Sequence, residues 1–158
     1  MNTRVLLDET GKYDSAILSL AAEQVWPHLD TEAVGRWLRV EPPFDTRYFV
    51  LVDEGNEVLG AAVYEIYDSF DDGSVDLDLA FCCIDEGYGK RFLRKLFVES
   101  FAAIRETFDV AALQAAVDCE EAAFWRGAFP DHPDRVEVVL VARGHRKIFF
   151  YVPIERTE

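Results

Sequence analysis

The sequence predicts an α/β (α+β) fold, a single domain over residues 1–158 with a twisted, mixed, mostly antiparallel sheet. Short apolar segments separated by turns rich in Asp, Asn and Gly are typical of hairpin strands. A long amphipathic pattern over 89–107 lies between two apolar strands, an arrangement that joins parallel neighbours in a sheet. The expected order is β-α-α-β-β-β-α-β-α-β-β, with about seven strands and about four flanking helices.

The N-terminal part of the chain contains one short strand and two helices. The strand is expected at Thr3–Leu7. Apolar residues recur at helical spacing over Tyr13–Val25, and a proline shortly afterwards ends this helix. Asp30 or Thr31 can cap the second helix, which ends before Pro42–Pro43.

The rest of the chain is dominated by strands. They are expected at Arg47–Val52, Val58–Tyr67, Val75–Ile84, Val110–Val117, Val136–Ala142 and Ile148–Ile154. The helices lie at 89–107 and Glu120–Arg126. In the strand Val75–Ile84, alternation predicts one apolar face and one more polar face. The apolar face holds Val75, Leu77, Leu79 and Phe81, and the other holds Asp76, Asp78, Ala80 and Cys82.

Composition limits the partners and the compartment. The chain has 30 acidic and 16 basic residues and a formal charge of −14, which repels nucleic acid and anionic membranes, so we expect neither as a partner. The acidity favours solubility or a basic protein partner. Three cysteines without paired spacing indicate free thiols and no metal site. Because no signal peptide and no stretch of ~20 apolar residues is present, we expect a cytoplasmic protein.

The loop between the strand Val75–Ile84 and the long helix is a candidate anion site. Gly87 and Gly89 stand at the start of this helix, where main-chain N–H groups lack intrahelical acceptors and glycine permits close approach. Four cations follow in the first turns, although the helix dipole disfavours positive charge there: Lys90, Arg91, Arg94 and Lys95. Either these side chains are simply solvated or an anion binds beside them.

Three stretches of the sequence resemble the GNAT superfamily of acyl-CoA-dependent N-acyltransferases. The segment Ile84-Asp85-Glu86-Gly87-Tyr88-Gly89 resembles the family signature Arg/Gln-x-x-Gly-x-Gly/Ala. "EVLGAAVYEI" (57–66) is similar to the family's third strand, including Gly60, and "AVDCEEAAFWRGAF" (116–129) is similar to its short helix after the fifth strand. The resemblance covers roughly residues 3–154.

The resemblance implies transfer of an acyl group from acetyl-CoA, as co-substrate, directly to an amine on a small molecule or a protein. The implied cofactor-binding residues are Cys82, Cys83, Ile84, Gly87, Tyr88, Gly89, Lys90 and Arg91. Such transfer needs a base, and the candidates are Asp76 and Asp78 on one face of the preceding strand. These two carboxylates can equally form the polar face of a half-exposed strand. Tyr88 can pack on the ligand or cover the start of the helix.

The sequence departs from the family pattern in ways that favour an alternative. Ile84 replaces the Arg/Gln, Asp85 and Glu86 would repel a pyrophosphate, and Phe124 stands where many members keep a general-acid tyrosine. The alternative is a GNAT-fold protein, viral or accessory, that has lost catalysis and modulates a partner protein through its acidic surface. The basic stretch Arg143–Lys147 is either a solvated turn or a contact for an acidic ligand or partner.

Overall fold

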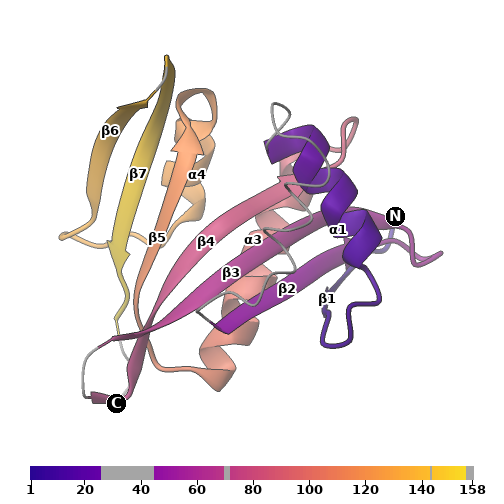
Figure 1. The fold of residues 1–158 in the computed structure, drawn as a ribbon, viewed down its shortest axis with the longest axis horizontal. Coiled ribbons are helices and arrows are strands. Elements are labelled where there is room, and N and C mark those ends of the chain that lie inside the picture. Colours follow the sequence, from indigo (N-terminus) through magenta and orange to yellow (C-terminus); the bar gives the residue numbers. More distant parts are fainter. Residues whose placement is uncertain (26–44, 70–71, 143, 156–158) are drawn as a thin grey trace.

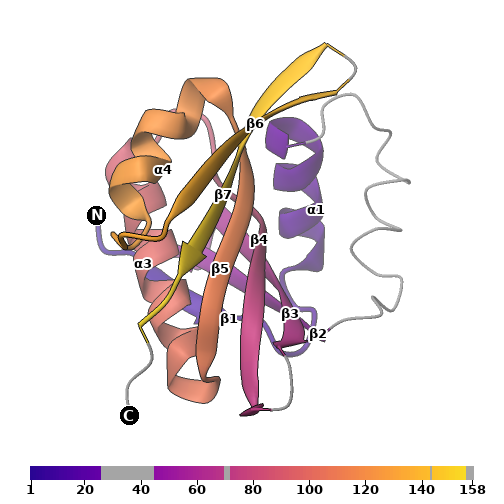
Figure 2. The same ribbon diagram turned by 90° about the vertical axis from the view of Figure 1, so that its left-hand side faces the viewer.

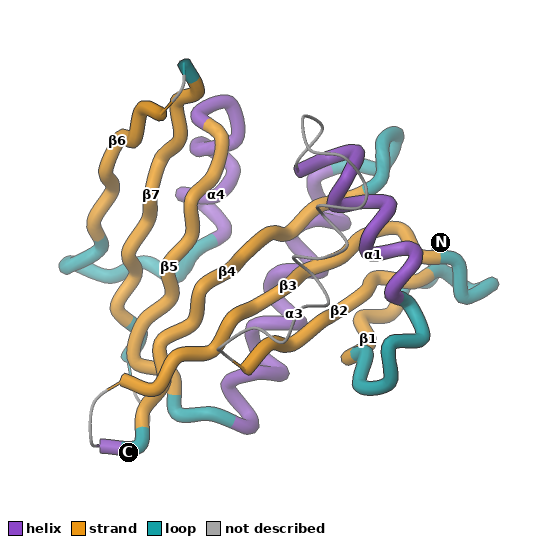
Figure 3. The backbone as a smooth tube through the Cα atoms, in the orientation of Figure 1, coloured by secondary structure: helices purple, strands orange, loops and turns teal. Residues whose placement is uncertain are grey.

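The computed structural model describes residues 1–25, 45–69, 72–142 and 144–155 of the chain. These form a seven-stranded sheet in the order β1-β2-β3-β4-β5-β7-β6 (Figures 1 and 3). The strands are β1 (Arg4–Leu7), β2 (Asp45–Val52), β3 (Val58–Ser69), β4 (Ser74–Ile84), β5 (Val110–Asp118), β6 (Val136–Ala142) and β7 (His145–Pro153). Neighbours are antiparallel except β4 and β5, which are parallel. The predicted mixed, mostly antiparallel sheet is therefore confirmed.

Helices cover both faces of the sheet. The α-helices are α1 (Asp14–Leu20), α3 (Lys90–Thr107) and α4 (Ala122–Ala128), with a π-helical turn at Ala21–Val25 and a 3-10 turn at Cys119–Glu121. Helices α3 and α4 lie on one face and α1 on the other (Figure 2). Each face has its own apolar core. The α3 side includes an aromatic cluster in which Trp125 and Phe129 stack and Phe97 meets both rings edge-on. The helix expected after Asp30 or Thr31 lies outside the described residues.

Most predicted boundaries are close to those observed, and two differ for identifiable reasons. The helix expected over Tyr13–Val25 keeps α-helical geometry only through Leu20 and then widens into the π-helical turn. The last strand begins at His145 rather than Ile148, because Gly144 adopts φ +79° and reverses the chain directly after β6.

The predicted alternation along β4 is wrong beyond Leu79. Leu79 lies opposite Tyr64 of β3, whereas Phe81 lies opposite Val63, so Ala80 is an extra residue in a β-bulge. Phe81 therefore packs in the α1-side core, while Cys82 changes to the α3 side. A bulge reverses the face of every side chain that follows it, which is why simple alternation failed here.

Candidate active site

The parallel strands β4 and β5 separate part way along their length, and the site lies between them. Their pairing runs from Val75 opposite Val110 to Asp78 opposite Gln114. Both strands continue beyond this point, to Ile84 and Asp118, and diverge in Figures 1 and 3. A cavity of about 720 Å³ opens in the resulting wedge. The main-chain edge of β4 that faces β5 is thereby released from sheet pairing beyond Asp78.

The cavity gathers most of the predicted cofactor-binding residues. Those that line it are Cys82, Cys83, Ile84, Gly87, Tyr88, Gly89 and Lys90. The opposite wall comes from β5 and the helical turns after it, including Val117, Glu121 and Trp125. Arg91 is exposed and stands outside this lining, with its guanidinium 4.7 Å from the centre of the Phe92 ring.

The glycine loop has the main-chain geometry of an anion site. The Asp85 amide donates to the Leu59 carbonyl at 2.7 Å, which anchors the loop to β3. Gly87 has φ +95°, a conformation that strongly favours glycine. Gly89 precedes α3, and no side chain caps this end of the helix. A Cβ at either glycine would meet nothing within 4 Å. The start of α3 is therefore uncrowded beside these glycines. Helix geometry gives the N–H groups of Lys90 and Arg91 no intrahelical acceptor, whereas the Phe92 N–H donates to the Gly89 carbonyl at 3.0 Å.

Gly60, by contrast, is needed for close packing beneath the loop. A Cβ there would lie 2.6 Å from Cδ1 of Ile84 and 2.7 Å from the carbonyl oxygen of Cys83. Glycine thus lets β3 approach the end of β4 and keeps the Ile84 side chain packed into the α3-side core. The apolar Ile84 contributes packing rather than charge.

The four cations after the loop do not converge on one point. Lys90 pairs with Glu121 at 3.3 Å, and Arg94 donates to the Gly127 carbonyl at 3.3 Å. Both cations lie over the ring of Phe124, at 5.3 Å and 5.4 Å from its centre. Lys95 instead donates to the Thr3 carbonyl, ahead of β1. Of these four, only Lys90 lines the cavity.

The two candidate carboxylates have different places. Asp78 lines the cavity at the point where β4 and β5 part, whereas Asp76 lies further back, opposite Ala112 in the paired region, and does not line it. Burial, and secondarily the negative charge of Glu65, raise the pKa of Asp78 to about 6. Such a carboxyl accepts and releases a proton near neutral pH, as a general base must.

Three further polar residues line the cavity, and only Lys147 was singled out from the sequence, as part of the basic stretch Arg143–Lys147. Glu65 of β3 lies opposite Asp78 of β4. The Tyr67 hydroxyl donates to Oε2 of Glu65 at 2.7 Å. Lys147 of β7 lines the cavity from the other side and pairs with Asp118 at 3.7 Å. Gln24, at the end of the π-helical turn, also lines it. All three are brought to the site by pairing or packing between segments distant in sequence.

The cysteines and Tyr88 supply surface rather than reactivity. Burial raises the pKa of the Cys82 thiol and raises that of Cys83 to about 12, so both thiols are neutral at physiological pH. The Tyr88 ring packs edge-on against Phe92 at 5.8 Å and so covers the start of α3 while also lining the cavity.

Solved structures share this fold over nearly the whole chain. A putative acetyltransferase of the GNAT family from Desulfovibrio desulfuricans is 13% identical, with a TM-score of 0.68, over 96% of this chain and 99% of that one. The NatC complex bound to Gag peptide and CoA contains a chain 12% identical, with a TM-score of 0.71, over 98% of this chain and 100% of that one. A spermidine N-acetyltransferase SpeG chimera from Vibrio cholerae and hSSAT is 16% identical, with a TM-score of 0.65, over 97% of this chain and 96% of that one.

These likenesses establish the fold: the chain has the GNAT fold, as its glycine loop and strand order predicted. No protein-family model matches the sequence, and no curated protein matches it either. Among the described residues, no helix is long and apolar enough to cross a membrane.

Proposed function

We propose that this protein is an acyl-CoA-dependent N-acyltransferase that transfers an acetyl group from acetyl-CoA directly to an amine. The observation that carries the proposal is the open wedge between β4 and β5, which meets the glycine loop and the uncapped start of α3 in one cavity. Main-chain N–H groups at a helix start favour a pyrophosphate. The released edge of β4 offers N–H groups to the thioester end of the same ligand.

In this proposal Asp78 is the base and Asp76 is not. A protonated amine entering the wedge loses its proton to the Asp78 carboxylate, directly or through water. The amine nitrogen then attacks the thioester carbonyl and an N–C bond forms. The C–S bond breaks as the thiolate leaves, and the thiolate takes up the second proton that the nitrogen loses in forming the amide. Main-chain N–H groups of β4 beyond Asp78 stabilise the negative oxygen that develops on the carbonyl.

The acceptor is an amine on a small molecule or a protein. Asp78 and Glu65 place negative charge inside the cavity, and the chain as a whole carries −14, so a cationic acceptor is attracted. Among the structural neighbours, the NatC complex is bound to a peptide and the SpeG chimera is a spermidine N-acetyltransferase. A panel of peptides with free N-termini and of polyamines therefore spans the acceptor class.

Calorimetry with acetyl-CoA and a thiol-release assay with this panel test the proposal together. We expect binding, and amine-dependent release of the coenzyme A thiol. Asp78→Asn should bind acetyl-CoA as the wild type does but turn over at least about a hundredfold more slowly. Asp76→Asn is the matched control and should keep its activity. Absence of acetyl-CoA binding at millimolar concentration would end the proposal.

A second function, a binding protein on the same fold, is favoured by the acidic side of the loop. Asp85 and Glu86 both line the cavity next to Gly87 and would oppose an anionic ligand. The ring of Phe124 has no proton to give. Under this alternative, acetyl-CoA fails to bind and a partner protein co-purifies in stoichiometric amount. Measurable thioester turnover without such a partner would exclude it.

A further inference from the structure

The exposed edge of the sheet at β6 has a feature that acyl transfer does not use. β6 stands last in the strand order, so one of its edges is unpaired within the described part of the chain. Five of its large apolar side chains are 43% to 68% exposed: Val136, Val138, Val139, Leu140 and Val141. They lie on both faces of the strand. Edge strands usually carry charges or proline that discourage pairing with another chain, whereas the charge within this strand is that of Glu137 alone.

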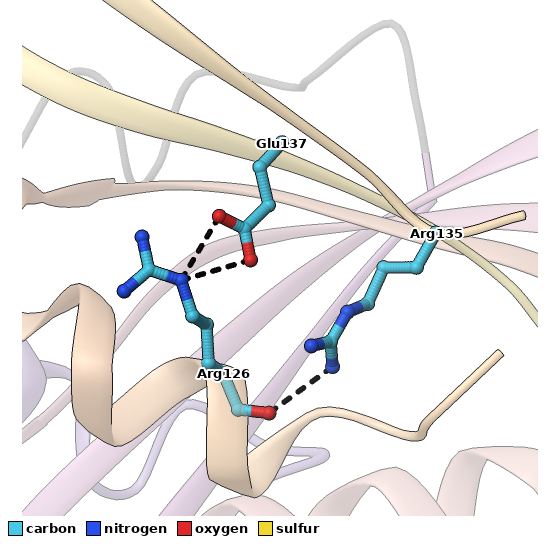
Figure 4. Close-up of polar contacts among 3 residues, drawn as sticks. All are labelled: Arg126, Arg135 and Glu137. Atoms are coloured by element: carbon cyan, nitrogen blue, oxygen red, sulfur yellow. Dashed lines mark hydrogen bonds and ion pairs between the residues drawn. The ribbon is translucent and has the colours of Figure 1, made fainter. Parts of the chain in front are cut away.

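The charged residue of β6 is neutralised within its own chain. Arg126 of α4 holds Glu137, with Nε 2.9 Å from each carboxylate oxygen (Figure 4). Arg135, just before the strand, donates to the Arg126 carbonyl at 3.1 Å. The strand therefore presents an apolar edge without net charge on a molecule that carries −14.

We propose that β6 pairs antiparallel with β6 of a second copy of this chain, about a two-fold axis at Val139. In this register Val138 lies opposite the partner's Leu140, and Glu137 lies opposite the partner's Val141. No carboxylate of β6 then faces a carboxylate, and apolar side chains meet across the axis. The two sheets join into one, which satisfies the main-chain groups of both edges.

The charges at the two ends of the strand favour a second copy as the occupant. Asp131 and Asp134 precede β6 and are exposed, while the neighbouring Arg135 is half-buried and donates to the Arg126 carbonyl. Arg146, paired with Val141, is exposed beside the other end of the strand. Antiparallel pairing brings the acidic end of one strand to the basic end of its partner, twice in each dimer. Parallel pairing would bring like charges together. Elsewhere the strongly acidic surfaces of two copies repel each other, so association is directed to this edge.

Sedimentation velocity on the full chain tests the proposal, and we expect a dimer at micromolar concentration. Val139→Lys places two ammonium groups opposite each other at the axis and should raise the dimer dissociation constant at least about tenfold. Val98→Lys is the matched control, because Val98 is a similarly exposed valine, 49% exposed, on α3. It should leave the dimer unchanged. Circular dichroism confirms that both variants remain folded.

Two further measurements locate the interface. Amide exchange over 136–142 should slow as protein concentration rises, and slowing elsewhere instead would contradict the proposal. Asp134→Arg and Arg146→Asp should each weaken the dimer, and an equimolar mixture of the two variants should re-form it. A monomeric wild type, or a dimer that Val139→Lys leaves intact, would overturn the inference whatever the enzyme assays show.

Discussion

Replacing Glu65 with glutamine should lower the pH at which Asp78 ionises. The two side chains project from directly opposed positions on β3 and β4 and line the same cavity. The pKa of Asp78 is raised from 3.8 to about 6, and burial is the larger cause, so the charge of Glu65 accounts for less than half of the rise. Glu65→Gln removes this charge but not the burial. The pKa should therefore fall by about one pH unit at most and stay above its ordinary value.

The sign of this effect distinguishes it from simple damage to the site. The base must be deprotonated, so kcat/KM rises with pH through the pKa of Asp78. This rise is the acidic limb of the pH profile of kcat/KM, and Glu65→Gln shifts it to lower pH. The variant therefore becomes more active relative to the wild type as pH decreases toward 5. Carbon-13 NMR titration of the Asp78 carboxyl gives a second readout that needs no turnover.

The control and the refuting result are equally specific. Asp76→Asn should leave the limb in place, because Asp76 does not line the cavity and is not among the charges that raise the pKa of Asp78. A limb that stays fixed in Glu65→Gln, or that moves to higher pH, would refute the electrostatic reasoning.

Three further outcomes follow from the same geometry. The pKa of Asp78 in the folded state exceeds its ordinary value of 3.8, so protonation of Asp78 favours the folded state. This contribution of Asp78 to the free energy of unfolding is lost as pH rises through about 6. Asp78→Asn should therefore raise Tm at pH 8, with the gain disappearing below about pH 4, as calorimetric scans would record. Lys90→Glu, at the cavity, should weaken acetyl-CoA binding in titration calorimetry more than Lys95→Glu, which lies away from it; equal effects would contradict the assignment. Gly60→Ala places a Cβ 2.7 Å from a main-chain oxygen of β4 and should cost about 1–3 kcal/mol in urea unfolding, whereas Gly89→Ala meets open space and should cost much less.

The local parts of the site could be predicted from sequence because local rules govern them. Gly87 and Gly89 follow an apolar strand and precede an amphipathic helix, and that order predicts the loop and makes it a candidate anion site. Helical geometry also separates the cations: Lys90 and Arg94 are four residues apart and share a face over Phe124, while Lys95 lies on another face. Grouping these cations by proximity along the chain therefore overestimates the positive charge at the cavity.

The non-local parts could not be predicted in this way. Glu65 reaches Asp78 only through the register of β3 on β4, and Lys147 reaches the cavity only because β7 inserts between β5 and β6. The bulge at Ala80 was hidden because the residues around it are apolar on both faces, so a change of phase leaves the pattern nearly unaltered.

The bulge at Ala80 lies between Asp78, the proposed base, and the glycine loop. Asp78 precedes the bulge and Gly87 follows it, so the number of residues between them determines both how far apart the two lie and which wall each intervening side chain joins. Deleting Ala80 would leave Phe81 next to Leu79 and still opposite Val63, so the later side chains would keep their faces and only the local bend and twist of β4 would be lost. A gain or loss of one residue between Phe81 and Ile84, by contrast, would exchange the faces of the side chains that follow it, so the length of that stretch is under tighter constraint than its composition.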